Sequence, residues 1–290
     1  MIREDDEISA MVEEKFKSDD INVLTNTRAI AAKKSGTEQV LVCESDGETI
    51  EIPFDAMLVA IGRKPNVEGF GLEKLDVKLR KNTTIETDGF LRTNYENIYA
   101  IGDVTGPFQF THTASHQAWF ATVNSLFGQF KKFKADYSVI PWATFTDPEV
   151  ARVGLNEAEA KDKGIKYEVT TYEIDDLDRA IADGEDHGLV KVLTVPGKDK
   201  ILGVTIVGAH AGDLLPEFVL AMKYKLGLKK ILGTIHAYPT MSEANKGVAG
   251  NWQKEHAPQF ALKILEHYHR WRRGKPGKQP EAKAATATIS

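Results

Sequence analysis

Gly102 and Asp103 stand at the end of a short apolar segment, Ile98 to Ile101. That segment has the pattern of a buried strand, and in an open parallel sheet ligands bind just past the carboxyl ends of the strands. Gly102 has no Cβ, so a ligand can approach its backbone closely. Asp103 offers carboxylate lone pairs to ligand hydroxyl groups. The pair therefore suits the binding of a polyol, although a turn or a cap is the more common role for such an aspartate.

The next segment suits the other end of such a ligand. A loop over residues 104–110 leads into a helical pattern that we expect from Thr111 to Phe127. The first N–H groups of a helix have no partner inside it, so they can bind a phosphate or a carbonyl oxygen. A ligand with hydroxyl groups, a phosphate and an electron-poor ring would fit this geometry. Flavin adenine dinucleotide (FAD) has all three.

Other residue types give weaker signals. His112 and His116 are four residues apart on the predicted helix, but no third ligand lies near them and no HExxH motif is present. We therefore predict no metal site. Cys43 is the single cysteine and lies in a strand pattern. One cysteine cannot form an intrachain disulfide or a zinc site made of cysteines.

Composition excludes several classes of protein. The chain has 290 residues, of which 42% are hydrophobic and 27% charged, as in a globular protein with a sizeable core. A net charge of -5 argues against general nucleic-acid binding. No apolar run approaches the roughly 20 residues of a membrane-spanning helix, and the acidic N-terminus is not a signal peptide. We expect a cytoplasmic protein with no nucleic-acid or membrane partner.

The first 62 residues predict a mixed pattern of elements. We expect a helix over 5–18, a strand over 21–27, a hairpin of 38–45 and 48–52 around Asp46-Gly47, and a strand over 56–61 buried on both faces. A nucleotide-binding domain normally opens with a strand, a glycine-rich turn and a helix. No such unit occurs in the chain. We therefore expect the chain to be the later part of a larger protein.

The remaining sequence predicts a second kind of architecture. From about residue 137, strand patterns come in pairs and are followed by helices. We expect strands within 138–154, 167–174 and 187–208, and helices over 156–163, 213–225, 228–236 and from Glu243 to about Arg273. This order is typical of an α+β domain on an antiparallel sheet. Residues 274–290 are too polar and small to pack, so we predict that they are disordered.

Four motifs then occur in a recognisable order: VAIGRKPN (59–66), TNYENIYAIGD (93–103), IPWATFTDPEVARVGL (140–155) and YPTMSE (238–243). Over about residues 2–257 the chain resembles the pyridine nucleotide-disulfide oxidoreductases, the flavoprotein family of dihydrolipoamide dehydrogenase, glutathione reductase and mercuric reductase. The resemblance implies an α/β plus α+β fold. Remnants of an NAD(P)-binding domain (1–62) and of an FAD-binding domain (63–136) would precede an antiparallel-sheet dimerisation domain (137–257), with a C-terminal helix and disordered tail over 258–290.

The resemblance also implies positions for the cofactors FAD and NAD(P). It places Gly102 and Asp103 at the hydroxyl groups of the flavin side chain, and Gly62 with Arg63 near the nicotinamide cofactor. The residues that it places along the flavin ring are Gln109, Phe110, Thr111 and His112.

This sequence departs from the family in its catalytic groups. The redox pair CxxxxC and the first FAD motif are absent, and the family's His-Pro-x-x-x-Glu dyad has Tyr238 in place of the histidine, with Glu243 retained. A tyrosine, with a pKa of roughly 10, donates hydrogen bonds but is a poor base at neutral pH. His236 is the alternative, because in an extended segment it would share a face with Tyr238. Glu243 also fits a capping box with Thr240, and the two roles can coexist.

The resemblance implies an oxidoreductase that passes hydride from NAD(P)H to FAD and then to a disulfide or another acceptor, in redox homeostasis. It implies that the protein forms a homodimer through residues 137–257. The enzyme would be similar in type to dihydrolipoamide dehydrogenase or mercuric reductase. The C-terminal cysteine pair of mercuric reductases is missing, which weighs against Hg(II) as the acceptor. We expect the chain to be inactive alone. The alternative is a non-catalytic dimerisation module.

Overall fold

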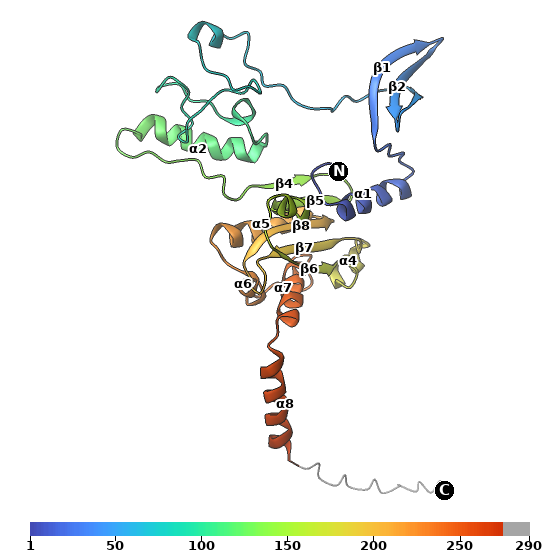
Figure 1. Ribbon diagram of the computed structural model, residues 1–290, viewed down its shortest axis with the longest axis vertical. Coiled ribbons are helices and arrows are strands. Elements are labelled where there is room, and N and C mark those ends of the chain that lie inside the picture. Colours follow the sequence, from blue (N-terminus) through green and yellow to red (C-terminus); the bar gives the residue numbers. More distant parts are fainter. Residues whose placement is uncertain (275–290) are drawn as a thin grey trace, which may run out of the picture.

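The computed structural model describes residues 1–274. Its centre is a domain built on a five-stranded sheet (Figure 1). Three parts extend from this domain: a small three-stranded sheet, an irregular segment with one long helix, and an isolated C-terminal helix. No helix among these residues is long and apolar enough to cross a membrane. Of the tail predicted to be disordered, 274–290, residues 275–290 lie outside the described residues.

Among the N-terminal elements, the helix and the hairpin follow the prediction, whereas β1 was not predicted. Helix α1 (Asp6–Ser18) leads to an antiparallel sheet of β1 (Thr27–Ser35), β2 (Glu38–Ser45) and β3 (Glu48–Phe54). Asp46 and Gly47 both have positive φ, as a two-residue hairpin turn requires. The predicted strand over 21–27 is wrong, because the chain turns at Asn26, also at positive φ, and only then enters β1.

The strand predicted over 56–61 is wrong as well. These residues form no regular structure, and Leu58 and Ile61 are 92% and 94% exposed. A strand needs neighbouring backbone to receive its hydrogen bonds. Within residues 1–274 the three-stranded sheet ends at Phe54, and no strand runs beside 56–61. The apolar pattern therefore has no partner here.

The strand predicted over Ile98–Ile101 is also absent. It is reduced to one isolated bridge between Arg92 and Tyr99. Ala100 is nevertheless buried in a small core with Val67, Val77 and Ile85. Short 3-10 helices, η1 (Leu72–Leu75) and η2 (Gly102–Thr105), precede α2 (Thr111–Phe127), whose bounds match the prediction.

The central domain confirms the α+β prediction. Its sheet has the order β4-β5-β8-β7-β6, all antiparallel, with β4 (Pro141–Thr144), β5 (Glu149–Gly154), β6 (Glu168–Glu173), β7 (Leu189–Thr194) and β8 (Ile201–Gly208). Its helices are α3 (Glu157–Asp162), α4 (Asp178–Asp183), which the sequence did not predict, α5 (Ala211–Lys223), α6 (Leu228–Leu232) and α7 (Glu243–Glu255). Helices α5 and α7 pack on the sheet, and their buried Phe218 and Trp252 belong to its main core.

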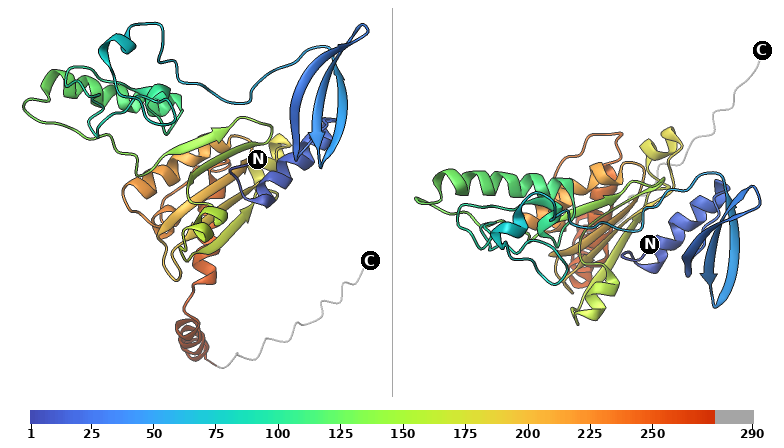
Figure 2. Two further views of the ribbon diagram at one scale, coloured as in Figure 1. Left: turned by 45° about the horizontal axis from the view of Figure 1, so that its top comes forward. Right: turned by 90° about the horizontal axis from the view of Figure 1, so that it is seen from above.

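Helix α1 packs against the same domain through a second, smaller core. Ile8 and Val12 contact Val150, Leu189 and Val207. In Figure 2, α1 lies between the five-stranded sheet and the three-stranded sheet. The N-terminal segment is thus fastened to the central domain, which is about 140 residues away in sequence.

Buried charges reinforce this attachment. Lys191 on β7 is 1% exposed, and its ammonium contacts Asp5 at 3.1 Å, Glu157 at 2.6 Å and also Glu7. Arg152 on β5 lies beside Glu4 and Glu159. Beyond the central domain, α8 (Gln259–Arg273) projects from the end of α7 (Figure 1).

Candidate functional site

Gly102 is held tightly against α2. Its φ is +76°, and its N–H donates a 2.5 Å hydrogen bond to Oε1 of the buried Gln117. A Cβ on Gly102 would lie 3.3 Å from the Cβ of Ala114. The hydroxyl of Thr105 donates to the carbonyl oxygen of Gly102 at 2.9 Å. The absence of a side chain is therefore what allows the η2 turn to meet the helix.

Asp103 is the second residue of the same turn. The side chain is half-buried, and none of the hydrogen bonds or ion pairs among residues 1–274 involves its carboxylate. Only its backbone carbonyl is engaged, by the N–H of Gly106 at 3.4 Å. A half-buried carboxylate without a protein partner can accept hydrogen bonds from the hydroxyl groups of a ligand.

The N-terminus of α2 lies a few residues further on. Phe110 is its N-cap and supplies no capping oxygen, and Thr111 and His112 are exposed. The first N–H groups of a long helix without a side-chain cap carry partial positive charge and can receive an oxygen atom. Turn and helix end together could bind hydroxyl groups and a carbonyl or phosphate oxygen.

The structure brings together two segments that are distant in the sequence, one at Gly62-Arg63 and the other at Gln109. Nη1 of Arg63 donates a 2.9 Å hydrogen bond to the carbonyl oxygen of Gln109. Gly62 precedes it at a φ of +153°, exposed, with no atom within 4 Å of where its Cβ would be. The segment predicted to meet the nicotinamide cofactor therefore touches the segment predicted to line the flavin ring.

An aromatic stack fixes the entry to α2. The ring of Phe110 is parallel to that of His112 at 5.1 Å and to that of Trp142 at 6.4 Å. Nε2 of His112 lies 2.8 Å from the carbonyl oxygen of Pro141. His112 is thus tied to β4, while His116 packs edge-on against Phe120.

His236 and Tyr238 do not share a face as an extended segment would predict. The His236 side chain is 6% exposed, and its Nε2 lies 3.1 Å from Oε1 of Glu217 on α5. Nδ2 of Asn245 donates to the other oxygen of Glu217 at 2.9 Å. Tyr238 is 70% exposed, and its hydroxyl donates to Asp178 at 2.7 Å.

Tyr238 and Glu243 do meet in one shallow pocket of about 380 Å³, which also includes Tyr172, Asp178 and Lys246. The hydrogen bond to Asp178 raises the pKa of Tyr238, so its phenol keeps its proton more firmly than a free tyrosine. An oxygen of Glu243 accepts the N–H of Thr240 at 3.3 Å, which is one half of the predicted capping box. The other half is absent, because the Thr240 hydroxyl donates to the carbonyl oxygen of Ala237 and the N-cap of α7 is Ser242. The pocket thus presents a proton donor beside carboxylates.

Sequence reasoning missed the partners of these groups. Asp178 lies in α4, which carried no clear helical signal, and Glu217 lies on another helix, α5, 19 residues before His236. Gln117 also went unnoticed, although a buried amide is informative once its place opposite Gly102 is known. None of these pairs has a local sequence signature.

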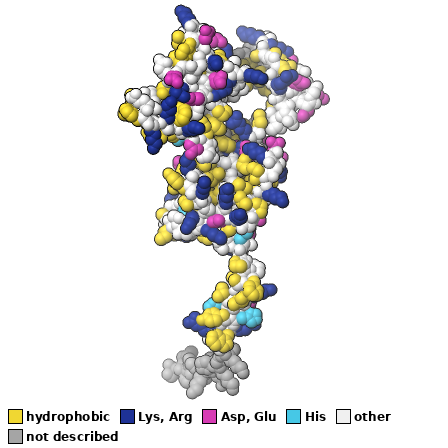
Figure 3. Space-filling view, turned by 60° about the vertical axis from the view of Figure 1, so that its left-hand side comes forward, with side chains coloured by type: hydrophobic (Ala, Val, Ile, Leu, Met, Phe, Trp, Pro, Cys, Tyr) yellow, Lys and Arg dark blue, Asp and Glu magenta, His cyan; other side chains and the backbone are white. Residues whose placement is uncertain are grey.

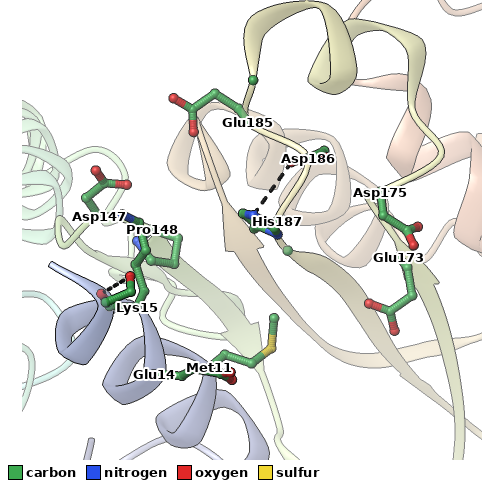
Figure 4. A pocket seen from close by; sticks show the side chains of 13 residues that line it. Met11, Glu14, Lys15, Asp147, Pro148, Glu173, Asp175, Glu185, Asp186 and His187 are labelled. Carbon is green, nitrogen blue, oxygen red and sulfur yellow. Dashed lines mark hydrogen bonds and ion pairs between the residues drawn. The ribbon is translucent and has the colours of Figure 1, made fainter.

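Two acidic groupings lie elsewhere. Oxygens of Asp5, Glu7 and Glu157 approach within 4.8 Å of one another, as around a metal, but the ammonium of Lys191 already contacts all three. A pocket of about 650 Å³ lies between α1 and the ends of β6 and β7 (Figure 4). It is lined by many carboxylates, among them Glu14, Asp147, Glu173, Asp175, Glu185 and Asp186. Such a surface repels the phosphates of a dinucleotide.

Comparison with known proteins gives a consistent picture. A family model described as pyridine nucleotide-disulphide oxidoreductase matches residues 1–118, and a model of the dimerisation domain of the same proteins matches residues 140–249. A dihydrolipoyl dehydrogenase of Mycobacterium leprae is 35% identical over 244 residues, which are 84% of this chain and 52% of that protein. One of Chlamydia muridarum is 42% identical over 190 residues, 66% of this chain and 40% of that protein.

Solved structures show the same fold. The HOCl-induced flavoprotein disulfide reductase RclA of Escherichia coli aligns with a TM-score of 0.78 at 22% identity, over 86% of this chain and 56% of that one. LpdA of Mycobacterium tuberculosis aligns with a TM-score of 0.75 at 24% identity, over 85% of this chain and 52% of that one. The chain therefore spans about half the length of the relatives that it matches.

Proposed function

Since the chain belongs to the pyridine nucleotide-disulphide oxidoreductase family, we propose that it supplies one edge of the flavin site and the dimerisation domain of an FAD-dependent NAD(P)H oxidoreductase. The proposal covers a reaction of the dihydrolipoyl dehydrogenase or mercuric reductase type, in which hydride passes from NAD(P)H to the flavin and then to a disulfide or another acceptor. FAD would supply the electron transfer, and the residues of this chain would bind and orient it.

The observation that carries this proposal is the unpartnered carboxylate of Asp103 beside Gly102 and the open end of α2. Asp103 would accept hydrogen bonds from hydroxyl groups of the flavin side chain. The backbone N–H groups at Thr111 and His112 would hold an oxygen of the flavin ring, and Gln109 and Phe110 would line it. Arg63, held on the carbonyl oxygen of Gln109, would keep Gly62 at the adjoining nicotinamide position.

Tyr238 would act on the acceptor side as a hydrogen-bond donor. Its raised pKa keeps the phenol protonated at neutral pH, so it can stabilise a developing thiolate but does not act as a base there. Glu243 lines the same pocket and would place its charge near the donor. His236, buried against Glu217, would act only by holding the 234–238 segment in place.

The domain over 137–257 would form a homodimer, since residues 140–249 match the family's dimerisation domain. The isologous pairing of two copies of one surface is the most common arrangement in such proteins. Because the chain spans about half of its relatives, we propose that it turns over no substrate by itself.

Complementation tests the proposal. The chain is mixed with the N-terminal half of the Mycobacterium leprae relative, and FAD binding is followed by quenching of flavin fluorescence. We expect binding by the pair and at least about tenfold weaker binding for Asp103→Asn, because a hydrogen bond to a charged group is lost. Asp162→Asn, an exposed aspartate on α3, is the matched control and should bind as the original chain does. Equal affinity of Asp103→Asn and the control would refute the role of Asp103.

The second candidate is a non-catalytic dimerisation module. The self-contained core under α5 and α7 favours it, since this core draws on no residue before 137. The same mixture decides between the two candidates. NADH oxidation supports the enzyme, whereas a stable dimer that neither binds FAD nor oxidises NADH in any mixture supports the module.

A further inference from the structure

Helix α8 has no packing partner among the described residues. None of its residues, Gln259–Arg273, is buried, and Phe260 and Trp271 are 79% and 78% exposed. It leaves the central domain after Pro258 and projects away from it (Figure 1). The matched dimerisation domain ends at residue 249, so the proposed oxidoreductase function does not account for this helix.

Most of the apolar residues of α8 gather on one face, and Leu262 on the opposite side is the exception. At 3.6 residues per turn, Phe260, Ile264, Tyr268 and Trp271 line up along the helix, and Leu265 adjoins them. Each of these side chains is 47–79% exposed, and Figure 3 shows apolar side chains on the surface of the narrow projection that leaves the central domain. A partner that covered this aromatic and aliphatic stripe would remove its apolar surface from water. The free energy gained would be roughly proportional to the area buried.

The remaining face is basic. It carries Lys263, Arg270 and Arg273, with Arg272 at the border of the apolar stripe, against the single acid Glu266. His269 lies on this polar side, whereas His267 adjoins Phe260 at the border of the apolar stripe. The excess of positive charge on α8 contrasts with the whole chain, whose net charge is -5.

Two features of this pattern favour a lipid surface over a second copy of the helix as the partner that covers α8. Tyrosine and tryptophan are enriched where an apolar phase meets water, because their rings are apolar and their polar tips stay hydrated. Pairing two copies of α8 would instead bring two basic helices together, and their like charges repel. An anionic surface attracts the same charges, by a factor of roughly five in partitioning for each lysine or arginine.

We infer that α8 is an amphipathic anchor that lies in the interface of an anionic membrane, with Phe260, Ile264, Tyr268 and Trp271 among the acyl chains and the basic residues at the headgroups. The sequence predicted no membrane partner, but that expectation rested on the lack of an apolar run long enough to span a bilayer. A helix that lies on the surface needs no such run.

Vesicle sedimentation of the full chain tests this inference. We expect the chain to sediment with vesicles of phosphatidylcholine and phosphatidylserine in a two-to-one ratio, and at least tenfold less with phosphatidylcholine alone. High salt should release it, because salt screens the headgroup charges. In the same mixtures, the fluorescence difference between the original chain and Trp271→Phe should shift to the blue, which reports burial of that indole.

Two double variants, each paired with a control double variant, test the apolar face and the basic face of α8 separately. Phe260→Ser with Trp271→Ser should abolish sedimentation, while Leu58→Ser with Ile61→Ser, which removes equally exposed apolar groups elsewhere, should not. Arg272→Glu with Arg273→Glu should lower binding at least tenfold, while Lys198→Glu with Lys200→Glu, of the same charge change, should have little effect.

Light scattering without lipid tests the alternative that a second copy of the chain covers α8. If no vesicle binds the chain, and the Phe260→Ser, Trp271→Ser variant alone converts a dimer to a monomer, then a second copy covers α8 and the inference is overturned. Sedimentation that is equal with neutral and anionic vesicles would also overturn the anionic surface.

Discussion

Arg152 and Glu4 face each other inside the protein: Nε of Arg152 lies 3.1 Å from Oε2 of Glu4, and both side chains are almost fully buried. The two atoms are close without the alignment of a hydrogen bond, so the contact is mainly one of charge. Removal of one member of a buried pair leaves the other charge without compensation, which is strongly destabilising.

We therefore predict that Glu4→Ala lowers the free energy of unfolding by about 3 kcal/mol, the low end for a buried pair because Glu159 still contacts Arg152 at 2.9 Å. Urea denaturation gives the measurement. Glu96→Ala removes an exposed partner of Arg92 at 3.6 Å and should change stability by no more than about 0.5 kcal/mol. Equal effects of the two substitutions would contradict the buried-charge account.

The Lys191 cluster should make stability depend on pH in the acid range. The hydrogen bond from Lys191, with a further one from Tyr167, lowers the pKa of Glu157 from 4.5 to about 2. A carboxyl group whose pKa is depressed on folding stabilises the protein above its unfolded pKa, and this contribution is lost as pH falls through its folded pKa. The contribution of Glu157 should therefore be complete above pH 4.5 and lost toward pH 2.

The measurement is the difference in unfolding free energy between the original chain and Glu157→Gln at several pH values. That difference should be on the order of 3 kcal/mol at neutral pH and should shrink between pH 4.5 and 2. Glu14→Gln, which removes an exposed carboxylate on α1, should give a small difference with little pH dependence. A difference for Glu157→Gln that stays constant in this range would show that Lys191 does not bind that carboxylate in solution.

Gly102 offers a test of the η2 turn that needs no cofactor. Gly102→Ala should destabilise the protein for two reasons, the left-handed φ of +76° and the 3.3 Å approach to Ala114. Gly164→Ala imposes a similar backbone strain at +64° with open space around the Cβ. We expect Gly102→Ala to cost about 1 kcal/mol more than Gly164→Ala in thermal or urea denaturation. Identical costs would mean that the contact with α2 relaxes freely.

The predictions from sequence succeeded where local signals and burial agree. The Asp46-Gly47 turn carries its own signal, and the strands of the central sheet lie next to one another within this chain. The segment 56–61 has as strong an apolar pattern, but a strand is defined by its neighbours, and none of the described residues supplies one. An apolar pattern of this kind predicts a buried strand correctly only where neighbouring strands are present to pair with it.

The candidate site shows the same division. The start of α2 was predicted correctly, and the Gly102-Asp103 turn precedes it along the chain. The strand expected to lead into that turn is absent, so the predicted place of Gly102 and Asp103 at the end of a parallel strand was wrong. The faces of His236 and Tyr238 could not, because their orientation is set by Glu217 and Asp178, which lie in separate helices. A periodicity argument assumes a regular strand, and residues 233–242 form turns and loops instead.

The contrast between His236 and Tyr238 gives the last prediction. His236→Ala removes a buried contact with Glu217 and should lower the free energy of unfolding by about 1–3 kcal/mol. Tyr238→Phe removes an exposed hydroxyl, so its effect on stability should stay within about 0.5 kcal/mol. In the complemented enzyme, Tyr238→Phe should instead reduce kcat at least about tenfold, because the proton donor is lost. Tyr224→Phe, at an equally exposed tyrosine, should change neither property. Full activity of Tyr238→Phe, together with loss of activity in a stably folded His236→Ala, would reverse the roles that the geometry assigns to the two residues.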